Sequence, residues 1–321
     1  MYKKFIIKII VIEAVLLIAY SVIVLNFKMF YMDPEYPMWL EVKQRTLDKT
    51  NNDMDIIMLG DSRAKAGFKP NILNKYKINS INLSVGGATP IEGYYTLKRY
   101  LENNKAPKNL VLSYTPTHLS SSDGCYFART VPFDFFTDSE YEEVENLAIK
   151  FNAYYILNQN KSYLDYKYPT IYGKHFIEGL KHFRWLANNQ FLEDSKNNKG
   201  YHYFGTKDEA IGLNSEAKKD KFISSKLYDY YFKKILDLAI QHKIRVYFYV
   251  MPFNESSYKI VKKEYVMEYE NYLKNLASYK NMKMNVCNNI WYLSNDNFGD
   301  PSHLYKGVDF NTLKVFNCIE N

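Results

Sequence analysis

The pattern of hydrophobic and polar positions first predicts a long helix near the start of the chain. Residues 5–27 are almost wholly apolar, which is long enough for a helix to cross the roughly 30 Å hydrocarbon core of a bilayer. Lys3, Lys4 and Lys8 favour a cytoplasmic N-terminus, and no small-residue cleavage site follows the apolar stretch. The pattern therefore predicts an uncleaved transmembrane signal anchor, a cytoplasmic tail over residues 1–4, and a single-pass cell-membrane protein whose C-terminal domain is extracytoplasmic.

One charged residue, Glu13, lies in the middle of this apolar stretch. A carboxylate inside a bilayer is costly in free energy. Two interpretations stay open. Either Glu13 pairs with Lys8 or with a polar group of a partner membrane protein, or it is neutral and tolerated in a single span.

After a linker with a short helix, expected over residues 28–52, short apolar runs alternate with amphipathic helical patterns. Strands are expected at 56–59, 78–83, 109–113, 244–250 and 282–286. Helices are expected at 69–76, 91–103, 222–242, 257–279 and 310–319. Strands that alternate with helices of this length are typical of a parallel, doubly wound sheet. The pattern predicts one α/β domain over residues 53–321, a three-layer α/β/α sandwich with a five-stranded parallel sheet.

Residues 120–214 interrupt this alternation and are expected to be an aromatic-rich insertion of helices and loops over the carboxyl ends of the strands. Tyr and Trp rings can stack on sugars, but they can equally well pack inside the insertion, and both interpretations stay open. The aromatic residues in question are Tyr126, Phe127, Phe135, Phe136, Tyr154, Tyr155, Tyr166, Tyr168, Tyr172, Trp185 and Tyr203.

Composition narrows the class of protein. The chain has 321 residues, is 47% hydrophobic and carries a formal charge of +7, so it should fold, and its mild, dispersed charge disfavours nucleic-acid binding. Its three cysteines, Cys125, Cys287 and Cys318, form no Cys-x-x-Cys pair, and buried thiols are expected rather than a disulfide framework or a zinc site. The histidines of the insertion, His175, His182 and His202, have no metal-ligand spacing and are expected at the surface. We expect no metal and no cofactor.

The candidate chemistry begins where the first predicted strand ends. Gly60 allows a sharp turn, and Asp61 and Ser62 follow at the carboxyl end of the strand, where open α/β sheets place their ligands. Far along the chain, Asp300 and His303 lie three residues apart. A serine nucleophile needs a base to take its proton and a third group to orient that base. The sequence therefore predicts a triad of Ser62, His303 and Asp300.

Two neighbours of Ser62 are assigned less sharply. Asp61 is expected to support the turn by hydrogen bonding. Arg63 either faces an anionic substrate or lies in solvent.

The pairing of Gly60-Asp61-Ser62 with Asp300-x-x-His303 resembles the SGNH/GDSL hydrolase superfamily, and the resemblance runs from Met54 to the C-terminus. Residues 82–87, Asn-Leu-Ser-Val-Gly-Gly, resemble the second conserved block of that family. The resemblance implies that the backbone amides of Ser62 and Gly87, or Gly86 in place of Gly87, stabilise an oxyanion. The alternative is that these glycines serve only the backbone angles of a turn.

The third block departs from the family. The usual Gly-x-Asn, which supplies a further oxyanion donor, is replaced by residues 114–118, Tyr-Thr-Pro-Thr-His. Thr117 or His118 could supply such a donor or contact substrate. Similar departures occur in membrane-anchored relatives that modify cell-surface polymers, such as the alginate O-acetylation proteins and the lipoteichoic-acid D-alanylation protein DltD.

The resemblance implies serine-dependent O-acyl transfer, of an acetyl or D-alanyl group, onto a cell-surface polysaccharide or teichoic acid. It also implies a multi-span membrane O-acyltransferase as a partner. Two alternatives stay open: a carbohydrate esterase that uses the same triad, and a non-catalytic protein that binds polysaccharide or scaffolds a membrane complex.

Overall fold

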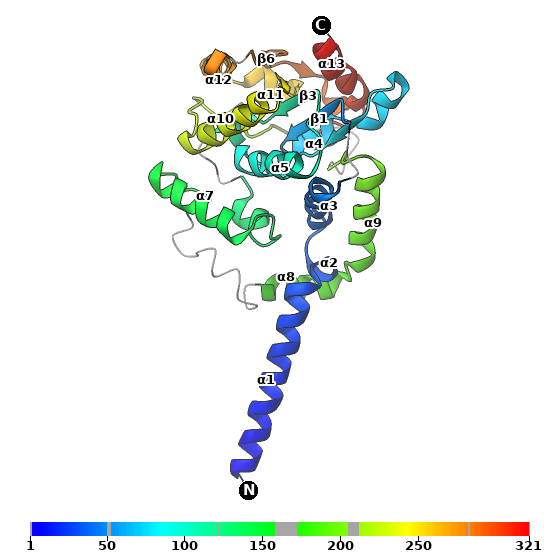
Figure 1. The fold of residues 1–321 in the computed structure, drawn as a ribbon, viewed down its shortest axis with the longest axis vertical. Coiled ribbons are helices and arrows are strands. Elements are labelled where there is room, and N and C mark those ends of the chain that lie inside the picture. The colour runs from blue at the N-terminus through cyan, green and yellow to red at the C-terminus, as the bar shows by residue number, and fades with distance from the viewer. Residues whose placement is uncertain are drawn as a thin grey trace.

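The computed structural model describes residues 2–49, 53–120, 122, 124–157, 172–204, 212–281 and 283–320 (Figure 1). Helix α1, Tyr2–Asn26, projects away from the rest of the protein (Figure 1). It is long and apolar enough to span a membrane, and its most apolar window is not buried. Glu13 lies on its exposed surface. The predicted N-terminal apolar helix is therefore present.

The segment that follows α1 is part of the folded body. It forms α2, Lys28–Tyr31, and α3, Tyr36–Leu47. Helix α3 packs against α5, Pro90–Asn103, and α9, Trp185–Asn197. Trp39 is only 1% exposed and Val42 is fully buried. The short helix expected in this segment is present as α3, but its apolar side chains pack into the folded body, so the segment is more than a linker.

The centre of the fold is a five-stranded, all-parallel sheet with the strand order β2-β1-β3-β4-β6. Its strands are β1 Ile56–Gly60, β2 Ser80–Asn82, β3 Asn109–Ser113, β4 Arg245–Phe248 and β6 Asn285–Val286. The predicted α/β class and the five parallel strands are confirmed, although β2, β4 and β6 are shorter than expected. The order reverses between β1 and β3, and open α/β sheets bind ligands at such a point.

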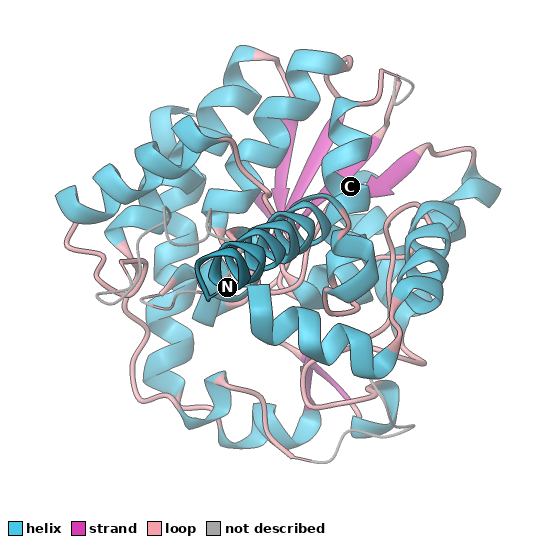
Figure 2. Ribbon diagram, turned by 90° about the horizontal axis from the view of Figure 1, so that it is seen from below, coloured by secondary structure: helices cyan, strands magenta, loops and turns pink. Residues whose placement is uncertain are grey.

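Side chains of the strands alternate between two hydrophobic cores, one on each face of the sheet. Ile57 and Leu59 join the core that includes α5 and α10, Lys226–Gln241. Ile56 and Met58 join the other core, which is closed by α13, Val308–Glu320. Figure 2 shows the strands flanked by helices on both sides. A strand buried on both faces reads as a continuous apolar run, which is why β1 and β3 were predictable.

Several short elements differ from the prediction. The expected helix over 257–279 is divided into α11, Glu255–Ile260, and α12, Lys263–Ala277, because the backbone at Lys262 is extended. Residues Pro70–Tyr76 form a 3₁₀ helix. The elements that were not predicted include the short helices α4, Ser62–Gly67, and α6, Pro116–Leu119, and the paired strands β5, Phe253–Asn254, and β7, Tyr292–Leu293.

The described part of the insertion contains a π-helical turn, Tyr126–Thr130, and the helices α7, Asp138–Lys150, α8, Gly173–His182, and α9. It lies only partly over the sheet. Helices α8 and α9 run beside α2 and α3 (Figure 1), and the chain returns to β2 where the Asn82 N–H donates to the Lys199 carbonyl (2.9 Å).

The aromatic residues named for the insertion differ in burial. Tyr126, Phe135, Phe136 and Tyr172 are buried, whereas Tyr154 and Trp185 are exposed. The packing interpretation is confirmed for the buried four. Tyr166 and Tyr168 lie outside the described residues.

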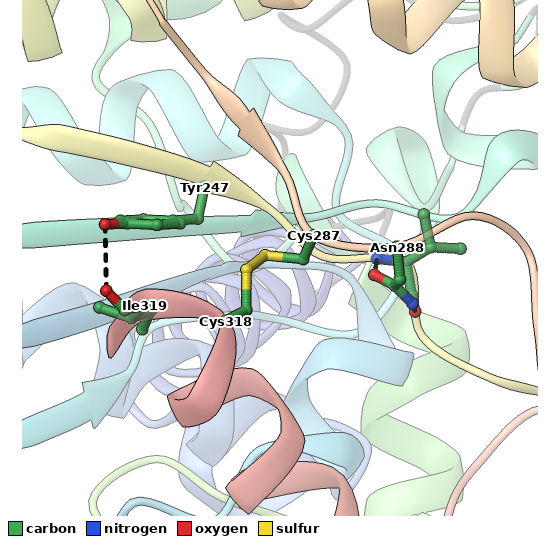
Figure 3. Close-up of a disulfide and its surroundings, with 6 residues drawn as sticks. Tyr247, Cys287, Asn288, Cys318 and Ile319 are labelled. Atoms are coloured by element: carbon green, nitrogen blue, oxygen red, sulfur yellow. Dashed lines mark hydrogen bonds between the residues drawn. A yellow bond between two sulfur atoms is a disulfide. The ribbon is translucent and has the colours of Figure 1, made fainter. Parts of the chain in front are cut away.

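A disulfide joins Cys287, just after β6, to Cys318 in α13, with 5.7 Å between the two Cα atoms (Figure 3). The prediction of buried thiols is wrong for these two residues, since spacing along the chain does not reveal that α13 returns to the edge strand. Cys125 is half-buried and outside the disulfide, and the Arg129 guanidinium donates to its sulfur (3.2 Å). The Tyr247 hydroxyl also donates to the Ile319 carbonyl (3.3 Å), which adds a second contact between the end of α13 and the sheet (Figure 3).

We expect the double variant Cys287→Ser/Cys318→Ser to lose about 3–4 kcal/mol of stability. The disulfide closes a loop with a sequence separation of 31 residues. Closing a loop of that length lowers the conformational entropy of the unfolded chain, which stabilises the folded state by this amount. Thermal unfolding of the full chain in detergent, with and without a reductant, measures the effect. The reductant should lower the melting temperature of the wild type and leave that of the double variant unchanged; equal responses would contradict the prediction.

Candidate active site

Ser62 lies at the junction of β1 and α4, where the chain leaves the sheet. Gly60 ends the strand against β3, and a Cβ atom at this position would lie 1.9 Å from the Ser113 carbonyl oxygen. Only glycine allows this close approach. Asp61 caps α4 by accepting a hydrogen bond from the Arg63 backbone N–H (2.9 Å). The predicted turn-supporting role of Asp61 is confirmed.

The structure brings together Ser62, His303 and Asp300. The His303 Nε2 atom lies 2.8 Å from the Ser62 Oγ, and the His303 Nδ1 atom lies 2.7 Å from an Asp300 carboxylate oxygen. The other Asp300 oxygen accepts the backbone N–H groups of Ser302 (2.7 Å) and His303 (2.9 Å). Asp300 therefore holds both the side chain and the backbone of the histidine.

The charge of Asp300 determines which ring nitrogen of His303 carries the hydrogen. Burial raises the pKa of Asp300, but the hydrogen bonds from His303 and the backbone outweigh burial and lower that pKa overall. Asp300 is thus an ionised acceptor, and Nδ1 carries the hydrogen that it accepts. The lone pair on Nε2 is left facing Ser62, which is the arrangement that a general base requires.

Aromatic residues at the end of the insertion pack against the loop that carries His303, residues 299–305. The ring of Phe204 lies 5.1 Å from the ring of His303, and Tyr203 stacks on Tyr305 at 4.7 Å. The Gly299 N–H donates to the His303 carbonyl (3.0 Å). Tyr203 was named among the aromatic residues, but Phe204 was missed, because nothing in its sequence context marks it.

The candidate substrate residues Thr117 and His118 are bound to buried carboxylates. The His118 Nδ1 atom lies 2.9 Å from Asp61, which also accepts the Thr115 N–H (2.7 Å). Burial raises the pKa of Asp61, but the hydrogen bond and charge of His118 outweigh burial and lower that pKa to about 2. The Thr117 hydroxyl donates to Glu216 (2.9 Å). Their roles as oxyanion donors or substrate contacts stay predictions.

Arg63 is inside the protein. Its guanidinium forms an ion pair with Glu216, and the two side chains are 5% and 0% exposed. The expectation that Arg63 lies in solvent is wrong, and the alternative that it faces a substrate receives no support, because its charge is already matched by a buried carboxylate. Glu216 was missed by the sequence analysis. It lies 153 positions from Arg63, with no motif to mark it.

The glycine-rich loop, residues 82–87, runs beside β1 toward Ser62. The Leu83 N–H donates to the Met58 carbonyl (2.8 Å), and the Val85 N–H donates to the Gly60 carbonyl (3.2 Å). Gly87 has a φ of +76°, and a Cβ atom there would lie 2.3 Å from the Cys125 sulfur. This position requires glycine for both its backbone angle and its packing. The oxyanion role of the Gly87 amide stays a prediction.

Three further titratable groups share the environment of His303. Lys65 is fully buried, its ammonium donates to the Ser84 carbonyl (3.1 Å), and burial lowers its pKa to about 8. Burial, followed by the charges of Lys65 and His303, lowers the pKa of His202 to about 4. Burial raises the pKa of Glu35, although Arg129 and then His303 act in the opposite direction. The surface assignment of His202 is wrong, because its ring is half-buried beside Phe204.

The buried Lys65 predicts a pH dependence of stability. Its pKa is about 8 in the folded protein and 10.5 without burial, so between these values the unfolded chain binds more protons and stability rises with pH. We expect the wild type to gain about 1 kcal/mol between pH 7 and pH 9 that Lys65→Met does not gain. Unfolding of the full chain in detergent at both pH values measures this difference. The exposed Lys219→Met should behave as the wild type, and an unchanged increment in Lys65→Met would contradict the assignment.

Neither the models of known protein families nor the curated proteins contain a match to this sequence. Within the described ranges, no group of three or more His, Cys, Asp or Glu side chains is arranged to hold a metal ion. The site offers a serine hydroxyl, a base in contact with it, and a carboxylate that orients the base.

Proposed function

We propose that this protein is a membrane-anchored, serine-dependent O-acyltransferase of the SGNH type, which moves an acetyl or D-alanyl group onto a cell-surface polysaccharide or teichoic acid. The observation that carries the proposal is the continuous chain from Ser62 through His303 to Asp300, with contacts of 2.8 Å and 2.7 Å. Such a constellation activates a hydroxyl for attack on an acyl carbonyl.

In the proposed first half-reaction, the Ser62 oxygen attacks the acyl carbonyl of the donor while His303 Nε2 takes the serine proton. Asp300 stabilises the imidazolium, and the backbone amides of Ser62 and Gly87 stabilise the oxyanion. The tetrahedral intermediate then collapses. The bond to the leaving group breaks, His303 returns the proton to that group, and the acyl group stays on Ser62 as an ester.

In the second half-reaction, a hydroxyl of the acceptor polymer attacks this ester. His303 takes the proton of that hydroxyl and delivers it to the departing Ser62 oxygen, which restores the free serine and leaves the ester on the polymer. Water in place of the polymer hydroxyl would give hydrolysis with the same residues. The esterase alternative therefore differs in the acceptor and not in the triad.

Two features support work on an envelope polymer beside a membrane. Disulfides such as Cys287–Cys318 persist in oxidising compartments outside the cytoplasm. The site is also close to the proposed anchor. Glu35, nine positions beyond the end of α1, forms an ion pair with Arg129 (2.6 Å), and its carboxylate lies against Gly86 of the glycine loop. Chain length alone keeps that loop within roughly 35 Å of the end of α1. A multi-span membrane protein that delivers the acyl group could reach such a site.

The test compares the ester content of envelope polymers in cells with the wild-type gene, a deletion, and the deletion complemented with Ser62→Ala. Loss of esters in the deletion, unrestored by Ser62→Ala, is the expected result. A rise in esters in both would identify an esterase. If Ser62→Ala restored the esters, Ser62 would not be the nucleophile, and a binding or scaffolding role would explain the deletion better. Immunoblots must show equal amounts of both proteins.

A further inference from the structure

A cluster of exposed apolar side chains gathers at the turn between α8 and α9. We call it the α8–α9 corner. Its members are Ile177, Leu180, Phe183, Trp185 and Leu186, which are between 41% and 72% exposed. Five large apolar side chains within ten residues are more than the single exposed hydrophobic residues that any soluble surface carries. The proposed triad does not involve this corner.

The corner is attached to the end of the apolar helix. Phe176 of α8 packs edge-on against Tyr20 of α1 (5.5 Å) and against Tyr31 of α2 (5.9 Å). Gly179 lies directly on Tyr31, where a Cβ atom would come within 2.3 Å of the Tyr31 Cα. Helix α8 therefore lies next to the junction of α1 and α2, on the side of the protein from which α1 projects (Figure 1).

Helix α9 is attached to the same junction. Phe30 contacts Phe183 (5.6 Å) and Trp185 (6.3 Å). The Asn188 side-chain amide, which is fully buried, donates to the carbonyls of Met29 (2.9 Å) and Met32 (3.1 Å). These contacts hold the corner at one height relative to the end of α1.

We infer that the α8–α9 corner lies in the interface of the lipid bilayer, as a second membrane contact beside the proposed α1 anchor. The inference rests on the proposed spanning role of α1. If α1 spans the bilayer, the boundary of the membrane is near Phe27, which is itself 51% exposed. Side chains tied to α1 and α2 at this level then meet lipid headgroups and the outer part of the acyl chains.

The chemistry of the corner fits this occupant. Phe and Leu side chains bury apolar area at the boundary of the acyl chains, and a Trp ring at the level of the headgroups keeps its N–H near water. Polar residues flank the apolar ones. Lys181 and His182 are both exposed on α8 beside Glu178, at 2.9 Å and 3.8 Å from its carboxylate. From there they can reach lipid phosphates while their stems cover apolar surface.

The consequence is orientation. A single helix leaves the domain free to tilt about its exit point, whereas a second contact beside the exit defines which side faces the bilayer. The glycine loop, connected to α3 through Glu35 and Arg129, would then be held at one height above the membrane. A donor delivered from the bilayer would meet the site in one orientation.

The test uses tryptophan fluorescence of the full chain in liposomes of phosphatidylcholine and phosphatidylglycerol, with and without acyl-chain bromination. The chain has three Trp residues: Trp39 is buried and Trp291 contacts Phe310 of α13. We expect brominated lipid to quench the fluorescence of the wild type, but only the part that comes from Trp185, one of its three Trp residues. Trp185→Phe should lose this quenching, and Trp291→Phe, the matched control, should keep it.

Equal quenching of the wild type and Trp185→Phe, or no quenching of either, would overturn the inference. Self-association through the corner, with Trp185 unquenched at all protein concentrations, would also overturn it and indicate a second copy as the occupant. Alkaline carbonate extraction of the same liposomes separates this outcome from a failure of the anchor. A chain that resists extraction but is not quenched keeps its α1 anchor and lacks only the second contact. None of these readouts depends on acyl transfer.

Discussion

Replacement of His303 by alanine should lower the rate at which Ser62 is acylated by an activated ester by about 10⁴-fold. The imidazole is the group that contacts the Ser62 oxygen, at 2.8 Å. Without it, the hydroxyl must lose its proton to water, and loss of one triad member typically removes this much rate or more. The measurement is burst kinetics of the full chain in detergent with a chromogenic ester, supported by mass spectrometry of the acylated serine.

A matched control keeps this prediction specific. His242→Ala removes an exposed imidazole at the end of α10, outside the triad, and it should acylate at the rate of the wild type. His202→Ala is informative in a different way, because its ring contacts Phe204, which in turn contacts His303. It should change the rate far less than His303→Ala. Unchanged acylation in His303→Ala would contradict the assignment of the base.

Arg63→Met should be strongly destabilising, with a loss of about 3–5 kcal/mol in the free energy of unfolding. It leaves the buried Glu216 carboxylate without its positive partner, and an unpaired charge in the interior is far more costly than the pair. Burial raises the pKa of Glu216, but Arg63 outweighs burial and lowers that pKa, so the glutamate is ionised in the wild type. The melting temperature of the full chain in detergent should fall by roughly 10 °C.

The double variant Arg63→Met/Glu216→Leu separates the effect of the two charges from the effect of the side-chain volume. Removing both charges should recover most of the loss, since buried pairs are often replaceable by apolar side chains of similar volume. Lys196→Met, which breaks the exposed pair with Glu193 on α9, should change the melting temperature little. A double variant as unstable as Arg63→Met would show that shape, not charge, is what this position requires.

Prediction from the sequence succeeded where the structure of a segment depends on residues that are neighbours in the chain. Strand β3 was predicted at its observed limits, Asn109–Ser113, because a strand buried on both faces leaves an unbroken apolar run. The contact of Ser62 with His303, and of His303 with Asp300, agrees with the predicted grouping of these residues, and their catalytic roles stay a prediction. In both cases the residues that carry the signal are next to each other or recur in a known arrangement.

Prediction failed where the cause is a contact between distant segments. The partners Arg63 and Glu216 are 153 positions apart, and the disulfide depends on α13 returning to β6. Short elements failed for another reason. Helix α4 has six residues, too few for an amphipathic period to appear, and its stability comes from the Asp61 cap and from the packing of its buried residues. Residues 28–47 appeared peripheral because the partners that bury them, α5 and α9, lie later in the chain.

The separation of 241 positions between Ser62 and His303 also has a consequence for biosynthesis. At translation rates of about 5–20 residues per second, the serine leaves the ribosome roughly 10–50 s before its base. Throughout that time the nascent chain carries an ordinary, unactivated hydroxyl. As the proposed nucleophile, Ser62 would become competent only when the final segment has been made and docked, so a half-made chain would not acylate what it meets.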